Sequence, residues 1–328
     1  MVTRSKSAIV LGILVLATVV ALPSTSTAQT HPRQIAIQHN LFGARQGAGL
    51  NTTIGTETRD DLEDRMSEIY LVSLNEVCYW QWEEVQELLT QALGYVPMAH
   101  WSISEPTDRC ALGGGDGDDQ TETVVPNPDP NNPQYNTIFG NVIIGLAPQG
   151  GPWPIGASSM FSHQNDPYPP PDNPPPTQWP EYRGTACLFG LRPPYQPSPN
   201  VTACTTHLAS APDSMTKHQL NDLTLGAVST VQANVPFFVM GDLNLVGMAP
   251  GDPTEDNNES QVIRDWWYPL FEEGDRAYGS GSKRSTSDYG AIDYVFRRAP
   301  ETFSQGPAIL DSPSSDHHWF ETYVWPAY

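Results

Sequence analysis

Six short apolar runs of the sequence end in polar side chains that are capable of chemistry, and this pattern limits the possible folds. The six ends are Asn40, Asn75-Glu76, Thr206-His207, Asp242 with Asn244, Asp293, and Asp316-His317. In an α/β scaffold, strand ends present side chains into a cleft with little backbone freedom. Taken singly, each end has a structural explanation, such as an Asx turn or a loop cap. Taken together, they form an oxygen-rich set with two histidines that suits a hard cation and a phosphate ester.

The hydrophobic pattern between these ends alternates between the period of strands and the period of helices. Nine segments are predicted as strands: 34–40, 71–74, 95–103, 141–146, 185–191, 201–207, 236–240, 291–296 and 319–324. Four segments are predicted as helices: 58–71, 82–93, 214–231 and 260–271. Strands with some adjacent pairs and interspersed helices predict α/β layering with mixed sheets.

A proline-rich stretch near 147–182 interrupts this alternation. It contains a Gly-Gly-Pro sequence and then eight prolines between Pro167 and Pro180. Such a composition is typical of loop or polyproline structure rather than of a domain core. Because strands are predicted again after it, we interpret the stretch as an insertion within a single domain that covers residues 29–328.

The first 28 residues are typical of an export signal. Arg4 and Lys6 form a positive region, residues 8–21 form an apolar run, and Ser26 and Ala28 provide the small residues of a cleavage site after Ala28. The apolar run has about 14 residues, whereas a membrane anchor needs about 20. No later segment is long and apolar enough to span a membrane, so the expected localisation is secreted, either extracellular or periplasmic.

The charge excludes two classes of partner. The chain has 16 Lys and Arg against 37 Asp and Glu, a net charge of −21, and loss of residues 1–28 with their two bases would lower it to −23. Such a protein cannot hold nucleic acid through a broad basic surface, nor lie on a membrane as a basic helix. Enzymes that bring a divalent metal ion to a phosphate remain compatible with this charge.

The four cysteines are expected to form disulfides, because the chain is predicted to reach an oxidising compartment. Four cysteines allow three connectivities, and the sequence fixes none of them. Pairing in sequence order, Cys78 with Cys110 and Cys187 with Cys204, gives two local loops and is favoured. Cys187 and Cys204 lie on segments that could be neighbouring strands, where a bridge forms easily. No CxxC pair is present, which argues against zinc.

Seven short motifs occur in a fixed order: Gln38-His39-Asn40, Leu74-Asn75-Glu76-Val77, Gly140-Asn141, Thr206-His207-Leu208, Gly241-Asp242-Leu243-Asn244, Ile292-Asp293-Tyr294 and Ser315-Asp316-His317. Each alone is a weak signal, but their order and the late position of the last one are specific. The chain thereby resembles the endonuclease/exonuclease/phosphatase superfamily over residues 34–324. This resemblance implies the deoxyribonuclease I fold, a four-layer α/β sandwich in which two mixed β-sheets pack face to face with helices outside.

The resemblance also implies a metal site and a phosphate site. Glu76 matches the principal metal-binding glutamate of the family, Asn40 lies beside it, and Asp316 is expected near the metal. Asp242 and Asn244 match the pair that positions the attacking water and holds the phosphate or a metal. The expected cofactor is Mg²⁺, with Mn²⁺ and Ca²⁺ as alternatives.

The proton-transfer residues follow from the same resemblance. His317 matches the catalytic histidine and Asp293 the carboxylate that orients it. His207 matches a second histidine of the nuclease-like, sphingomyelinase-like and toxin-like branches, although a satisfied core histidine is its structural alternative. One histidine would assist the water and the other would protonate the leaving alkoxide, and the sequence does not assign which. Arg183 is expected to contact the substrate phosphate.

The substrate remains open, because members of the superfamily share a metal centre and differ in the loops that choose the substrate. His207 and the expected disulfides favour a secreted DNA endonuclease, although the chain has only 3 Lys. Trp153, Tyr168 and Trp179 could instead serve a sphingomyelinase-like lipid phosphodiesterase, and phosphoinositides or sugar phosphates are further candidates. A catalytically silent binding protein with the same fold is the alternative from another class. The sequence does not specify a partner subunit.

Overall fold

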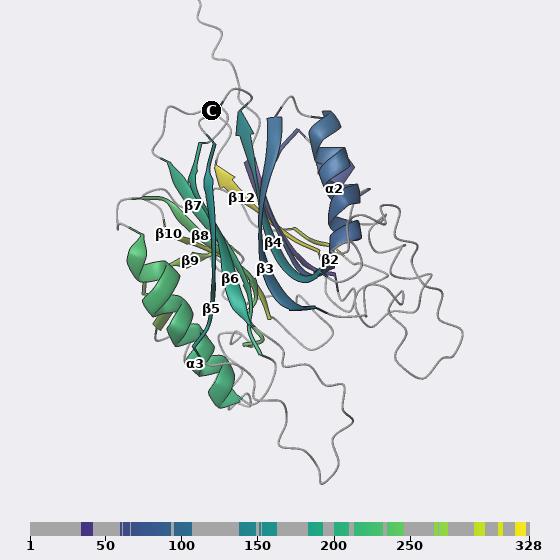
Figure 1. Cartoon of the computed structure of the whole chain (residues 1–328). Coiled ribbons are helices and arrows are strands. Elements are labelled where there is room, and N and C mark those ends of the chain that lie inside the picture. The colour runs from purple at the N-terminus through teal and green to yellow at the C-terminus, as the bar shows by residue number, and fades with distance from the viewer. Residues whose placement is uncertain are drawn as a thin grey trace, which may run out of the picture.

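Two β-sheets packed face to face form the centre of the protein, and a helix covers the outer face of each (Figure 1). The computed structural model describes residues 34–41, 60, 62–65, 67–92, 95–106, 138–148, 151, 153–162, 183–192, 200–209, 213–231, 235–245, 266–267, 269–274, 292–298, 308–310 and 319–325. The predicted export signal, Cys110 and the prolines between 167 and 180 lie outside these residues.

The first sheet has six strands in the order β11-β12-β1-β2-β4-β3. Their bounds are β1 Gln34–Asn40, β2 Ile69–Cys78, β3 Tyr95–Pro106, β4 Ile138–Pro148, β11 Ala308–Leu310 and β12 Trp319–Trp325. β1 and β2 are parallel, whereas the other neighbours pair antiparallel. Helix α2, Tyr79–Ala92, follows β2 directly and lies on the outer face of this sheet (Figure 1).

The second sheet also has six strands, in the order β5-β6-β7-β8-β10-β9. Their bounds are β5 Ile155–Met160, β6 Gly184–Leu191, β7 Val201–His207, β8 Phe237–Asp242, β9 Glu272–Glu273 and β10 Asp293–Arg298. β7 and β8 are its parallel pair. The connection between them contains helix α3, Asp213–Leu223, which continues as the π-helix η2, Thr224–Val228, on the outer face. In the described part of the chain, no helix is long and apolar enough to cross a bilayer.

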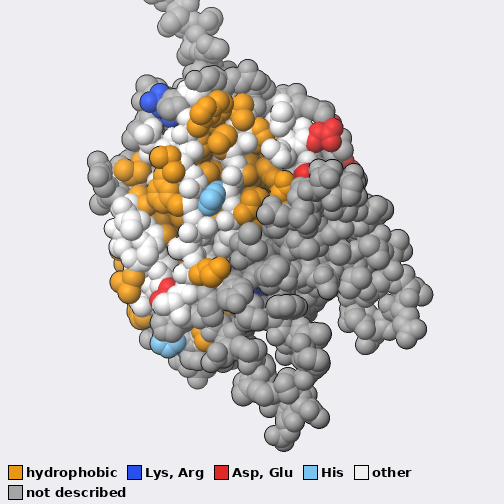
Figure 2. Space-filling model, viewed as in Figure 1, with side chains coloured by type: hydrophobic (Ala, Val, Ile, Leu, Met, Phe, Trp, Pro, Cys, Tyr) orange, Lys and Arg blue, Asp and Glu red, His pale blue; other side chains and the backbone are white. Residues whose placement is uncertain are grey.

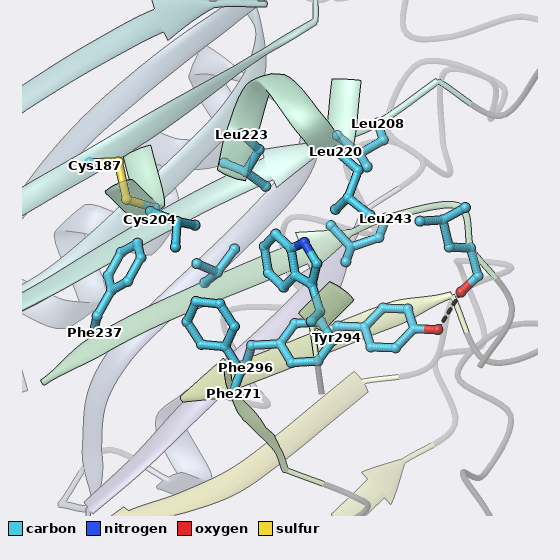
Figure 3. Packing of buried hydrophobic residues seen from close by; sticks show 14 of the residues in the cluster. Cys187, Cys204, Leu208, Leu220, Leu223, Phe237, Leu243, Phe271, Tyr294 and Phe296 are labelled. Carbon is cyan, nitrogen blue, oxygen red and sulfur yellow. Dashed lines mark hydrogen bonds between the residues drawn. A yellow bond between two sulfur atoms is a disulfide. The ribbon is translucent and has the colours of Figure 1, made fainter. Parts of the chain in front are cut away.

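Three apolar layers hold the four structural layers together. One, which includes Leu71, Leu188 and Phe238, lies between the two sheets. A second packs α2 against the first sheet, and a third packs α3 against the second sheet. Figure 3 shows the third layer, where the rings of Tyr294 and Phe296 stack beneath the helix. The central strands have an apolar layer on each side, so the side chains on both of their faces are mostly apolar and buried.

The predicted four-layer sandwich of two mixed sheets is confirmed, and the predicted strand 201–207 matches β7 at both ends. Three predictions were wrong in detail. The helix expected over 58–71 stops before Ile69, because residues 69 and 70 belong to β2. The proline-rich stretch contains the edge strand β5 and the end of β4 rather than loop alone. The helix expected over 214–231 changes to π-helical winding at Thr224.

The predicted bridge between Cys187 and Cys204 is present and joins β6 to β7 at directly paired positions. Cys78 is also disulfide-bonded. Its predicted partner, Cys110, lies outside the described residues, so that part of the pairing stays a prediction. Most of the helix expected over 260–271 also lies outside them, and residues 266–267 form a short π-helical turn.

Candidate active site

The two parallel strand pairs bring the predicted site residues to one edge of the sandwich. β1 and β2 end together, with Asn40 paired to Asn75, and β7 and β8 end together, with His207 paired to Asp242. β10 runs antiparallel to β8 and begins at Asp293, which is paired with Asp242. Residues at the carboxyl ends of parallel strands line the crevice in which open α/β sheets bind ligands. The register within each sheet therefore places Asn40 beside Asn75, and both His207 and Asp293 beside Asp242.

His207 lies between two carboxylates that come from different sheets. Its Nδ1 is 3.7 Å from Glu76 Oε1, and its Nε2 is 3.4 Å from Asp242 Oδ2. The side chains of His207 and Asp242 are buried, whereas 21% of the Glu76 side chain is exposed. Both carboxylates attract positive charge to this position, whether an imidazolium or a metal ion carries it. The cluster combines a proton-carrying ring with two cation-binding groups.

Both oxygens of the Asp242 carboxylate accept hydrogen bonds. Oδ2 accepts from Asn40 Nδ2 at 3.0 Å, a bond that crosses from the first sheet to the second. Oδ1 accepts from the backbone N–H of Asn244 at 2.8 Å, and Asn244 Nδ2 donates to the Leu208 carbonyl at 2.7 Å. The bond between Asp242 and Asn244 is the Asx turn expected as their structural explanation. That turn also holds both side chains in the site.

The backbone is in the left-handed region at two site residues. Among the described residues other than glycine, only Glu76, with φ of 52°, and Asn244, with φ of 50°, have positive φ. Glu76 lies where the β2–β4 pairing shifts register, between Leu74 and Val77. Such irregularities bend the strand and re-aim a side chain, and they are frequent next to active sites. Strain of this kind is tolerated mainly at functional positions, where it is of order 1–3 kcal/mol per residue.

Gly241 allows β7 and β8 to approach each other immediately before His207 and Asp242. Its φ is 143°, and a Cβ atom on it would lie 1.9 Å from the carbonyl oxygen of Thr206. That oxygen belongs to the backbone of the neighbouring strand and cannot move aside cheaply. The glycine of the Gly241-Asp242 motif is therefore required by the close approach of the two strands.

A layer of buried amides, which the sequence analysis did not assign to the site, lies directly behind these residues. Gln38 Nε2 donates to Asn75 Oδ1 at 2.7 Å and to Asp293 Oδ1 at 3.3 Å, and Asn75 Nδ2 donates to Asn141 Oδ1 at 3.0 Å. All four side chains are fully buried. Gln38, Asn75 and Asn141 stand inside the quoted motifs, so their position in the motifs was the available signal.

Comparison with solved structures identifies this architecture. An endonuclease/exonuclease/phosphatase from Beutenbergia cavernae DSM 12333 aligns at 18% identity over 89% of this chain and 71% of that chain, with a TM-score of 0.59. The human nocturnin catalytic domain with bound sulfate aligns at 15% identity over 90% of this chain and 93% of that chain, with a TM-score of 0.54. The chain has the endonuclease/exonuclease/phosphatase fold. No protein-family model and no curated protein matches the sequence.

A third structure with the endonuclease/exonuclease/phosphatase fold, from Bacteroides vulgatus, gives the same result. It aligns at 12% identity over 88% of this chain and 97% of that chain, with a TM-score of 0.54. Identities this low concern the arrangement of the sheets and helices alone. What the site does must be argued from its own residues.

Within this fold, Arg183 lies at the same edge as the cluster. It directly precedes β6, whose Thr185 pairs with Thr206 of β7, and its side chain is 7% exposed. Its role as a phosphate contact stays a prediction. Asp316 and His317 lie outside the described residues, and their predicted roles are likewise untested.

The donors of the site fit a hard divalent cation in chemical type. Glu76 and Asp242 supply carboxylate oxygens and Asn40 supplies an amide, which are ligands that Mg²⁺ and Mn²⁺ prefer. Within the described ranges, no group of three or more His, Cys, Asp or Glu side chains is arranged to hold a metal ion. The third predicted acid, Asp316, lies outside those ranges.

Proposed function

We propose that the protein is a divalent-metal-dependent hydrolase of phosphate esters. The observation that carries this proposal is the position of His207 between Glu76 and Asp242 at the strand ends of an endonuclease/exonuclease/phosphatase fold. Hydrolysis of a phosphate ester needs a group that moves a proton and a site that tolerates negative charge on the phosphoryl oxygens. In the cluster, His207 can move the proton. Its carboxylates can bind a cation that offsets the negative charge on the phosphoryl oxygens.

Each residue of the cluster has a role in this proposal. Asp242 and Asn244 hold the attacking water and the phosphate, with Asp242 fixed through both of its oxygens. Of the two histidines, His207 and His317, one accepts a proton from the water and the other donates a proton to the leaving oxygen. Asp293 orients His317 and keeps one tautomer of its ring.

Glu76, Asp242, Asn40 and Asp316 are the residues that would hold the metal ion. When bound there, Mg²⁺ or Mn²⁺ supplies positive charge that stabilises the phosphoryl oxygens. Arg183, at the same edge of the second sheet, is the proposed phosphate contact.

DNA is the proposed substrate, and the proposed location is outside the cell. The bridge between Cys187 and Cys204 supports an oxidising compartment, as does the bonded state of Cys78. The sulfate in the nocturnin structure supports oxyanion binding by a protein of this fold. In this proposal residues 29–328 form a single catalytic domain.

Plasmid nicking tests the proposal. The purified chain without residues 1–28 is incubated with supercoiled DNA and Mg²⁺, beside EDTA and the variants His207→Ala and His317→Ala. Loss of either histidine is expected to lower the rate by about 10²–10⁴. The matched control is His218→Ala, because His218 is an exposed histidine on α3. Nicking that persists in EDTA or in His207→Ala would contradict the proposal.

A lipid phosphodiester is a second candidate, and one observation favours it. Apolar side chains gather on one face of the protein, over the region of β3, β5 and β6 (Figure 2). They include Trp153, Ile155 and Met160, which are 49%, 72% and 64% exposed. Met160 pairs with Gly184, so this surface reaches the site edge of the sheet. If the protein hydrolyses sphingomyelin or phosphoinositide vesicles and does not nick plasmid DNA, the substrate is a lipid rather than DNA. If it hydrolyses no phosphoester, a binding protein is favoured.

A further inference from the structure

The side chain of Asn75 is the point where the two sheets meet behind the candidate site. Its oxygen accepts hydrogen bonds from Gln38 Nε2 at 2.7 Å and from the backbone N–H of Asp242 at 2.9 Å. Gln38 lies in the first sheet and Asp242 in the second. Asn75 is fully buried, so these bonds do not compete with solvent.

The nitrogen of the same side chain reaches two further strands. Asn75 Nδ2 donates to Asn141 Oδ1 at 3.0 Å and to the carbonyl oxygen of Thr206 at 3.2 Å, and Thr205 Oγ1 lies 3.3 Å away. Asn141 belongs to β4 of the first sheet, whereas Thr205 and Thr206 belong to β7 of the second. One carboxamide therefore contacts four other strands.

These bonds end next to the residues proposed to do chemistry. Asn75 directly precedes Glu76, Thr206 directly precedes His207, and Asp242 is bonded through its own backbone. The Asn75 side chain itself is fully buried and lies behind the cluster. A change at Asn75 must alter the spacing of three site residues at once.

We propose that Asn75 is a positioning residue that fixes the distances between Glu76, His207 and Asp242. This inference rests on the proposed function, because it concerns the same site. The oxygen and the nitrogen of the Asn75 carboxamide have different roles. The oxygen holds Asp242 in place for the metal, and the nitrogen holds the strand that carries His207. Partners that orient a ligand from behind typically change metal affinity or activity by about 10- to 100-fold when removed.

Ser73 provides a matched control for the structural part of this role. Its Oγ is 2.7 Å from Thr205 Oγ1, so it also forms a buried bond between β2 and β7. Ser73 lies on the same strand as Asn75, and the Thr205 hydroxyl that it bonds also lies 3.3 Å from Asn75 Nδ2. Ser73→Ala therefore measures the loss of one inter-sheet hydrogen bond beside Asn75, while the bonds of Asn75 to Asp242 and Thr206 stay in place.

The test uses the oxidised protein without residues 1–28 and measures Mn²⁺ affinity from the free-ion EPR signal, phosphodiester hydrolysis and thermal unfolding. Asn75→Ala is expected to weaken Mn²⁺ binding and to lower kcat, each by about 10- to 100-fold. Asn75→Asp keeps an oxygen for Asp242 and loses the nitrogen bonds. Its second oxygen faces the Thr206 carbonyl and Asn141 Oδ1, so its unfolding temperature is expected to fall as well. It is expected to keep Mn²⁺ affinity within about threefold and to lower kcat about tenfold. Ser73→Ala is expected to lower the unfolding temperature while both site readouts stay within about threefold.

The outcomes separate this inference from the proposed function. A wild-type protein that binds Mn²⁺ and hydrolyses phosphodiesters, together with an Asn75→Ala variant that does both equally well, would overturn the inference alone. Equal losses in Asn75→Ala and Ser73→Ala would also overturn it, because they would show a general effect of sheet separation. A wild-type protein that neither binds Mn²⁺ nor hydrolyses any phosphodiester would overturn both. If Asn75→Ala does not fold, the split between affinity and kcat in Asn75→Asp decides the matter.

Discussion

A methyl group at position 241 would meet the backbone of the neighbouring strand. The Cβ of Gly241→Ala would lie 1.9 Å from the Thr206 carbonyl oxygen, and the residue would keep a φ that alanine rarely adopts. We expect the free energy of unfolding to fall by about 3 kcal/mol or more, with loss of hydrolysis as His207 and Asp242 separate. Urea denaturation measures the first effect. Gly226→Ala is the control, because open space surrounds that glycine and alanine there should be neutral or stabilising by up to about 1 kcal/mol.

The left-handed backbone of Glu76 makes a second prediction at the residue scale. In an ordinary strand, glycine is less stable than alanine by about 0.5–1 kcal/mol. At φ of 52° the order should reverse, so Glu76→Gly should be more stable than Glu76→Ala by about 1 kcal/mol, although both lose the carboxylate. Denaturation of the two variants measures the difference. The same pair at Ser159, an exposed strand residue of ordinary φ, should show the usual order. Alanine ahead of glycine at both positions would mean that Glu76 carries no strain.

The site residues at strand ends could be predicted from the sequence, whereas most of the buried amides behind them could not. Glu76, His207 and Asp242 stand at the ends of apolar runs, and the structure places a carboxylate oxygen of each acid within 3.7 Å of the His207 ring. Gln38 has no predicted role, and Asn75 is predicted only as the polar end of a strand beside Glu76. A buried amide matters only through its partners, and those are set by the register between two sheets, which no local pattern encodes.

At the scale of elements, the disulfide between β6 and β7 is the clearest case for a prediction. It joins Cys187 to Cys204 across 17 residues, and both sulfurs lie in the apolar layer beneath α3 (Figure 3). Replacing both cysteines with alanine should lower the free energy of unfolding by about 3 kcal/mol. Hydrolysis by the folded protein should persist, because Thr206 Oγ1 and Thr185 Oγ1 still bond the two strands near His207.

Denaturant titration and rate measurements at a temperature well below unfolding check this prediction. The single variants Cys187→Ala and Cys204→Ala are the control. They also lose the bridge, but each keeps one thiol in the core. A double variant that remains fully folded and loses hydrolysis would show that the bridge shapes the site itself.

Strands were predicted accurately where buried side chains give the sequence a clear apolar pattern, and poorly where exposed side chains do not. β7 is buried along its whole length and was predicted to the residue. β5 is exposed at all six positions and lies at the edge of its sheet, so no apolar pattern marks it. Ile69 and Tyr70 have helical spacing with Leu62 and Met66. They belong to β2 because the strand pairs with β1 from Ile69 onward, and pairing between distant segments outweighed the local period.

At the scale of the whole molecule, two similar halves meet at the edge that holds the candidate site. Each sheet contributes one parallel pair, and the connection in the second half runs through α3 on the outer face. Acidic side chains converge at this edge in a chain whose net charge is already −21. An anionic substrate must therefore approach against the field of the protein, and a cation bound at the edge would reverse that field only locally.

This charge predicts an unusual salt dependence if DNA is the substrate. Repulsion between an acidic protein and DNA extends about 30 Å at 0.01 M salt but only about 10 Å at 0.1 M. At fixed Mg²⁺, kcat/KM on plasmid DNA should therefore rise severalfold as NaCl increases from about 0.01 to 0.1 M, because screening removes the repulsion. A nuclease with a basic binding surface shows the opposite slope, since salt competes with its phosphate contacts. Bis(4-nitrophenyl) phosphate, which carries one charge, should respond much less and serves as the control. A kcat/KM that falls with salt would mean that local cations such as Arg183 govern the encounter, and the acidic surface would then play no part in it.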